Sequence, residues 1–394
     1  MQGQRVRSRV PFFLVAGGLF VMLMASNMPT PLYAVYRQKL GFSAVELTLI
    51  FATYAICLVP SLILFGQLSD RVGRRPVILV GLLGGVVSLA LFAAAQSTVW
   101  LFAARAVQGL ATGLMTAAAA AALVELETEG HHGRAAAATV LGNNGGSGAG
   151  PLVAGMLAQW APERLVLPYL VGIGCIGLAL LGILSIQEPV QPSGQWRIQR
   201  PSVPAAVRGR FARASLSGAC VWAVGALFLS VVPSYAAQLL HTTDLALLGA
   251  ITALMLATSC VAQLGLLRID ARPSEAQPAG LAMMAMGVVL LVVAFPLHSL
   301  VPVLAAALLA GLGLGVVLFG AQKDINQLAP TDRRGEVTAA FISCLYGGVA
   351  ITSVATGLLA DGYGLSTSVA IIGGVLAALA IGMCVWHAVA RRDR

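Results

Sequence analysis

Charged residues are scarce in this sequence. Only 10% of its 394 residues are charged, against about a quarter in a typical soluble domain, whereas 58% are hydrophobic and the mean hydropathy is +0.88. This scarcity excludes water as the main solvent of the chain. Because a lipid core offers the backbone no hydrogen-bond partners, the segments that cross it must be helices of about 20 mostly apolar residues.

Paired cysteines and catalytic groupings are lacking too. The six cysteines lie singly in apolar runs, a pattern that argues against a disulfide framework or a thiolate metal site. The sequence places no nucleophile, base and acid at catalytic spacing, and it has no phosphate-binding motif. We therefore expect a protein that is not an enzyme and that has neither a cofactor nor a metal.

Long apolar runs dominate the chain instead. We predict an all-α membrane protein with twelve transmembrane helices. The predicted spans are residues 12–36, 44–68, 76–95, 98–123, 135–160, 166–187, 213–238, 245–267, 278–297, 301–322, 335–360 and 366–390.

The basic residues indicate an orientation. An even number of spans puts both termini on one side, and 20 of the 24 Lys and Arg residues fall on that side. By the positive-inside rule both termini are predicted to be cytoplasmic. The prevalence of Arg over Lys and the abundance of Ala and Gly suggest a bacterial inner (plasma) membrane. Topology and anionic lipids account for the net charge of +9, so no nucleic-acid partner is expected.

The chain divides into two halves. A stretch rich in Pro and Arg interrupts the hydropathy, which predicts a first six-helix bundle over 1–187, a cytoplasmic linker over 188–212 and a second bundle over 213–394. An offset of 202 residues aligns the halves without a gap, and parallel repeats of this kind predict a central pathway and rocking of one half against the other. We expect a monomer. The aligned pairs include Pro31 and Pro233, Tyr33 and Tyr235, Gly109 and Gly311, and Gly155 and Gly357.

A loop rich in Gly and Arg joins the second and third spans. It reads Gly66-Gln-Leu-Ser-Asp70-Arg71-Val-Gly73-Arg74-Arg75-Pro-Val-Ile78 and resembles the cytoplasmic signature of the major facilitator superfamily, with Ser69 in place of the usual Ala. Glycine permits a tight turn, and an aspartate suits the positive end of a helix. The resemblance implies two pseudo-symmetric six-helix bundles. It also implies that Asp70 contacts the helix that begins near Gly335 and closes the cytoplasmic side.

Arg105 is the one charge embedded well within a predicted span. A lone charge at that depth costs several kcal/mol, so Arg105 should face a wet cavity or a polar partner. With Gln108, Gly109 and Gly113 it resembles a second signature of the same superfamily, R-x-x-Q-G. Arg105 could bind an anionic substrate group or couple transport to protonation, and the sequence leaves both roles open.

The fifth span carries a glycine pattern. Gly146-x-x-x-Gly150-Pro151-x-x-Ala154-Gly155 resembles the antiporter signature of drug and proton exchangers, with Ala154 replacing one glycine. Glycines every four residues make a face for close helix packing, and Pro151 bends the helix. A generic packing face is the alternative interpretation. The resemblance favours export over uptake.

A convincing proton carrier is missing from the spans. Glu46, near the outer end of 44–68, is the preferred candidate, and an exposed helix start is the alternative interpretation. Some exporters of this family have an acid where this chain has Asn27. Polar residues expected along the pathway suit an amphipathic or hydrophobic organic compound. They are Asn27, Asn143, Asn144, Tyr235, Gln263, Gln322 and Tyr346.

Three functional hypotheses follow. The first is an exporter of a small organic, drug-like compound that works by alternating access in exchange for protons. The second is an uptake permease for an organic anion, with Arg105 as its counter-charge. The third is a membrane sensor or scaffold that transports nothing, which predicts a sealed centre and leaves Arg105 unexplained.

Overall fold

The computed structural model describes residues 9–127, 132–188, 201–269, 273–330 and 333–392, and across these ranges the chain is helical without strands. The helices of the first half are α1 (Val10–Asn27), α2 (Pro29–Leu40), α3 (Ala44–Phe65), α4 (Leu68–Val72), α5 (Arg74–Ala93), α6 (Thr98–Leu126), α7 (His132–Val140), α8 (Gly146–Trp160) and α9 (Leu167–Leu184), with a π-turn at Leu141–Gly145.

The second half begins with a short 3-10 turn at Ala205–Val207. Its helices are α10 (Arg208–Ser230), α11 (Val232–Leu239), α12 (Leu245–Arg268), α13 (Pro273–Leu297), α14 (Leu300–Leu328), α15 (Arg334–Tyr363) and α16 (Leu365–Arg392).

The predicted all-α membrane architecture is confirmed. Within the described residues, eleven helical stretches are long and apolar enough to cross a membrane. The remaining predicted span, 135–160, is helical throughout, but the π-turn divides it into α7 and α8. Two other spans are each made of two helices that meet at a proline: Pro29 starts α2, and Pro233 lies in the first turn of α11. Proline lacks the N–H group that would continue the preceding helix.

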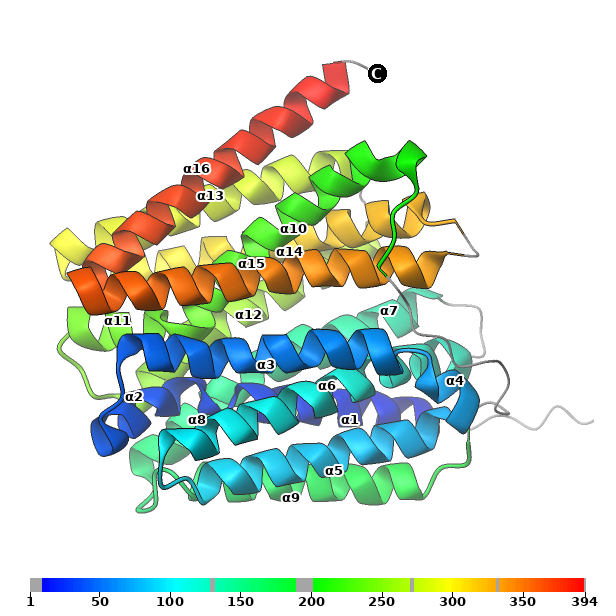
Figure 1. Ribbon diagram of the computed structural model, residues 1–394, viewed down its shortest axis with the longest axis horizontal. Coiled ribbons are helices and arrows are strands. Elements are labelled where there is room, and N and C mark those ends of the chain that lie inside the picture. Colours follow the sequence, from blue (N-terminus) through cyan, green and yellow to red (C-terminus); the bar gives the residue numbers. More distant parts are fainter. Residues whose placement is uncertain (1–8, 128–131, 189–200, 270–272, 331–332, 393–394) are drawn as a thin grey trace, which may run out of the picture.

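The long helices lie side by side and run between two faces of the molecule (Figure 1). Both α1 and α16 have their free ends on one face, here called the terminal face, while α2 and α11 lie at the opposite face. In Figure 1 α1–α9 form the lower part and α10–α16 the upper part. The two parts meet where α3 packs on α15 and where α8 packs on α12. The boundary predicted at 188–212 falls largely outside the described residues and stays a prediction.

Close helix packing depends on glycine at several crossings. A Cβ atom at Gly146 would collide with the carbonyl oxygen of Phe20, and one at Gly150 would collide with that of Met24, so α8 lies directly against the backbone of α1. Lipid chains are as apolar as leucine, and membrane helices therefore associate through such van der Waals contact rather than through the hydrophobic effect.

This packing predicts a difference between two glycine variants. Gly146→Ala should lower the melting temperature of the detergent-solubilised protein by several degrees, because the Phe20 carbonyl belongs to a helix backbone and cannot move aside. Gly174→Ala is the control, since a Cβ atom there meets open space. A thermal shift assay checks both variants. Equal melting temperatures would contradict the packing argument.

Candidate functional site

The break between α1 and α2 leaves backbone carbonyl groups short of helical partners. Pro29 follows Met28 at the break and has no N–H group, so it cannot donate to the carbonyl of Ala25 four residues earlier. An unpaired carbonyl group is costly in an apolar interior, and a side chain from another helix has to reach it. Here these side chains come from α6.

Arg105 and Gln108 of α6 donate to this break. The guanidinium of Arg105 donates from Nε to the Tyr33 hydroxyl at 2.5 Å and from Nη1 to the Ser26 carbonyl at 3.0 Å. Gln108 accepts from Arg105 Nη1 at 2.6 Å, and its Nε2 donates to the Ala25 carbonyl at 3.4 Å. Arg105 and Gln108 are each only 1% exposed. Arg105 therefore has polar protein partners.

Four aromatic rings surround the same guanidinium. Arg105 Cζ lies 5.3 Å from the ring centroid of Tyr33, 5.5 Å from that of Phe51 and 5.7 Å from those of Tyr54 and Phe92. A desolvated cation gains about 2 kcal/mol from a contact of this kind. Among the described residues Arg105 has no carboxylate partner, and its Nη2 makes no hydrogen bond. Neutral groups thus surround the guanidinium cation, and its Nη2 can still donate a hydrogen bond.

The aromatic cluster continues into the second half of the chain. Tyr54 of α3 interacts with Tyr346 of α15, and the Tyr346 ring meets Trp222 of α10 edge-on with 4.8 Å between centroids. Phe51 lies in a small buried cluster between the same helices. Tyr346, a residue predicted along the pathway, thus contacts one of the rings that surround Arg105. Phe51, Tyr54 and Trp222 do not stand out in the sequence, because aromatic residues in an apolar span equally suit the core or lipid.

Two other residues predicted along the pathway bond within their own helices. Asn27 donates to the carbonyl four residues earlier at 3.0 Å, and Gln263 donates to the hydroxyl four residues earlier at 3.5 Å. Tyr235 is buried and donates to the Leu291 carbonyl at 3.0 Å, which joins α11 to α13. Gln322 is exposed on α14. The geometry brings none of these four into hydrogen-bond contact with Arg105.

The predicted asparagines of the fifth span lie in an irregular part of the helix. Asn143 and Asn144 are half-buried within the π-turn. The thiol of Cys260, on α12, interacts with the backbone of Gly145 across the interface between the two halves. Single π-turns often occur at functional sites, because they shift the register of the side chains and leave backbone groups free. No sequence pattern distinguished this turn from regular helix.

The glycine pattern of the fifth span serves two interfaces. Gly146 and Gly150 lie against α1, whereas Gly155 lies against the backbone at the start of α12. The carbonyl of Pro151 approaches Gly249 of α12 so closely that a Cβ atom would not fit there. The pattern therefore joins the helix both to its own half and to the other half. Gly109 and Gly113 of the second signature, expected at the central cavity, also serve close packing: they lie against α3.

Glu46 stabilises a helix start. Its carboxylate Oε2 accepts a hydrogen bond from the Ser43 N–H at 2.9 Å, while its own N–H donates to Ser43 Oγ at 3.1 Å. This reciprocal pair is a capping box at the N-terminus of α3. The arrangement accounts for Glu46 as a structural residue, and proton carriage by Glu46 stays a prediction.

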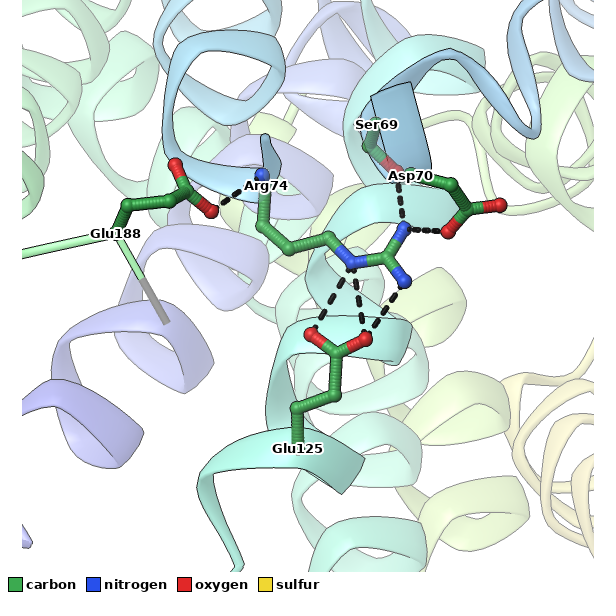
Figure 2. Close-up of polar contacts among 5 residues, drawn as sticks. All are labelled: Ser69, Asp70, Arg74, Glu125 and Glu188. Atoms are coloured by element: carbon green, nitrogen blue, oxygen red, sulfur yellow. Dashed lines mark hydrogen bonds and ion pairs between the residues drawn. The ribbon is translucent and has the colours of Figure 1, made fainter. Parts of the chain in front are cut away.

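The signature loop forms a charged network at the terminal face (Figure 2). The Arg74 guanidinium lies 2.5 Å from Asp70 Oδ1, 2.6 Å from Ser69 Oγ and 2.6 Å from Glu125 Oε1. Asp70, whose predicted partner was the helix that begins near Gly335, is thus paired within its own loop, and its side chain is 45% exposed. Glu125 comes from the end of α6. The network ties α4, α5 and α6 together.

Gly73, Arg75 and Glu188 extend this network. Gly73 has φ +99°, which favours glycine, and a Cβ atom there would also collide with the Glu188 carboxylate. That carboxylate accepts hydrogen bonds from the N–H groups of Arg74 at 2.6 Å and Arg75 at 3.1 Å. The Arg75 guanidinium donates to the last carbonyls of α9. Arg71, by contrast, is exposed.

The ion pair between Arg74 and Glu125 can be tested by a double-mutant cycle. The side chains are 12% and 25% exposed, so the variants Arg74→Gln, Glu125→Gln and their combination should give a coupling free energy of about 1 kcal/mol in chemical unfolding of the solubilised protein. Glu163→Gln, at an exposed carboxylate of the opposite face, is the control and should show no coupling to Arg74→Gln. Additive effects of the first pair would contradict the network.

Comparisons with known proteins agree with this architecture. The Major Facilitator Superfamily profile matches residues 15–353. The class E tetracycline resistance protein of Escherichia coli is 33% identical over 191 residues, which are 47% of this chain and 44% of that protein. The puromycin resistance protein pur8 of Streptomyces alboniger is 32% identical over 170 residues, 43% of this chain and 33% of that protein. The matched stretches therefore span less than half the length of these relatives.

Solved structures of low sequence identity share the fold. A POT family transporter in complex with 5-aminolevulinic acid superposes with a TM-score of 0.74 at 15% identity, over 96% of this chain and 95% of that one. The nucleoside transporter NupG gives a TM-score of 0.73 at 12% identity, over 95% and 98%. The profile match covers most of the chain, and its members are membrane transporters and not enzymes. This protein therefore belongs to the Major Facilitator Superfamily.

Proposed function

We propose that this transporter exports a small, drug-like organic compound by alternating access, in exchange for protons, across a bacterial plasma membrane with both termini in the cytoplasm. The observation that carries the proposal is the buried Arg105 guanidinium, which neutral groups hold within an aromatic cluster that reaches from α3 to α10 and α15. A charge at this depth is costly, and in membrane proteins such charges mark substrate or ion pathways.

The aromatic surroundings suit an aromatic or amphipathic substrate. The rings of Tyr54, Trp222 and Tyr346 are half-buried and offer stacking surfaces, while Arg105 Nη2 can donate to a carbonyl or acidic oxygen. Apolar walls with a few polar anchors are typical of sites for small organic ligands. The relatives named for resistance to tetracycline, to puromycin and to multiple drugs support export of such compounds.

Alternating access would move the first half, 1–187, against the second, 213–394. The two are held together along α3 with α15 and α8 with α12, and rocking about these contacts would open the terminal and opposite faces in turn. In that cycle Asp70, which is 45% exposed here, would reach the start of α15 when the terminal face closes.

Uptake of an organic anion is the second candidate. It is favoured by the lack of a carboxylate partner for Arg105 among the described residues, since an anionic substrate would supply the missing counter-charge. The two candidates differ in direction and in the charge of the substrate.

Transport into inside-out vesicles tests the proposal. With a proton gradient, acid inside, the wild-type protein should accumulate tetracycline, puromycin or another lipophilic drug and should discharge the gradient as it does so. Arg105→Gln should abolish accumulation, and Arg105→Lys should reduce it at least about tenfold, because a compact ammonium cannot replace the planar set of donors. Arg268→Gln, at an exposed arginine, is the matched control and should transport normally.

Two outcomes would argue against export. If no compound accumulates and none discharges the gradient, proton exchange is untenable. If the Arg105 variants lose binding of anionic ligands selectively, the uptake hypothesis replaces export.

A further inference from the structure

The two halves lie in close contact at the opposite face. The start of α12 lies against Gly155 of α8, and the start of α3 lies against Gly357 of α15. A Cβ atom at Gly155 would collide with the Leu245 carbonyl oxygen, and one at Gly357 would collide with Thr48 Oγ1. Figure 1 shows α3 alongside α15 over much of their length. Each contact brings the N-terminus of one helix against the last turns of a helix from the other half.

A carboxylate bridges the contact between α3 and α15. Asp361 of α15 accepts hydrogen bonds from the N–H groups of Ala44 at 2.9 Å and Val45 at 3.3 Å, the first two residues of α3. The N–H group of Glu46 is taken by Ser43. The first N–H groups of a helix have no partner within it, and the helix dipole favours a negative group at that end. Asp361 therefore completes the cap of a helix from the other half.

An amide bridges the contact between α8 and α12. Gln159 Oε1 on α8 accepts a hydrogen bond from the N–H group of Leu245, the first residue of α12, at 2.8 Å. The cap of α12 is completed locally, because Asp244 Oδ1 accepts from the N–H group of Leu247 at 3.0 Å. Gln159 crosses between the halves, whereas Asp244 belongs to the helix that it caps.

The two bridges occupy equivalent positions in the internal repeat. Gln159 and Asp361 are 202 residues apart, as are Gly155 and Gly357, and 202 is the offset that aligns the two halves of the sequence. Each half thus supplies a glycine that allows close approach and, four residues later, a polar side chain that caps a helix of the other half. A bridge that arose by chance would have no reason to recur at the same offset.

We propose that Asp361 and Gln159 are positioning residues for transport: a symmetric pair of latches that holds the opposite face closed and releases when that face opens. This inference rests on the proposed function, because latches have a role only in alternating access. Asp361 is exposed and Gln159 is half-buried, so water can replace either acceptor once the halves separate. The latch formed by Asp361 carries a charge and caps two N–H groups, and it is the stronger of the two.

Labelling of a reporter cysteine tests the latches without a substrate. Thr48, 1% exposed and packed on Gly357, is replaced by cysteine in membrane vesicles, and an impermeant maleimide is added on the side opposite the termini. Labelling of the native cysteines is measured in the protein without the reporter cysteine and is subtracted. Asp361→Ala and Gln159→Ala should each increase the labelling rate about fivefold or more, and the double variant should increase it further.

Control variants separate a latch from general loosening. Asp244→Ala removes a cap that does not cross between the halves and should leave the labelling rate unchanged. Gln159→Glu retains an acceptor and should label as slowly as the parent. An unchanged rate in the folded double variant, or an equal increase with Asp244→Ala, would overturn the proposal. The labelling experiment needs no substrate, so it can support the latches even if the vesicle experiment finds no transport. A failure of the latch proposal is therefore distinguishable from a failure of the proposed function.

Discussion

Every backbone N–H and C=O group in this apolar protein needs a partner, and the helix ends and breaks are where the backbone cannot supply one. The structure meets this need with side chains from other parts of the chain. Glu188 caps α5, Asp361 caps α3 and Gln159 caps α12. At the proline break between α1 and α2, Arg105 and Gln108 donate to carbonyl groups instead. Several polar contacts between helices therefore lie where helices start, stop or break.

These contacts differ in what they join. Glu188 and the Arg74 network connect helices of the first half at the terminal face, so they stabilise that half as a unit. Asp361 and Gln159 connect the two halves at the opposite face. Between the faces, glycine allows α8 to lie against both α1 and α12. A transporter needs this combination, because contacts within a half can persist through the cycle while those between halves must break and re-form.

Arg105 joins the structural and the functional demands. Its hydrogen bonds to Ser26 and Tyr33 hold the break between α1 and α2 in place. Its Nη2 can still donate a hydrogen bond, and aromatic rings surround the guanidinium. In the second half Ala307 stands at the position equivalent to Arg105, and Tyr235, equivalent to Tyr33, bonds to the Leu291 carbonyl instead. The repeat thus preserves the fold, while the charge belongs to the first half alone.

The sequence by itself determined the class of protein and the extent of most helices, because hydrophobic length and the placement of proline are properties of the chain. It also singled out Arg105, since a lone charge in an apolar span stands out without a structure. Only the tertiary structure decided the partners: Arg74 for Asp70, the capping box for Glu46, and the aromatic ring of Phe51 and Tyr54 around Arg105. Arg74 lies four residues from Asp70 and Ser43 lies three residues from Glu46, and the local fold of the chain brings each pair together. Phe51 and Tyr54 come from a different helix, and the rotation of each helix about its axis, which hydropathy leaves undetermined, turns them toward Arg105.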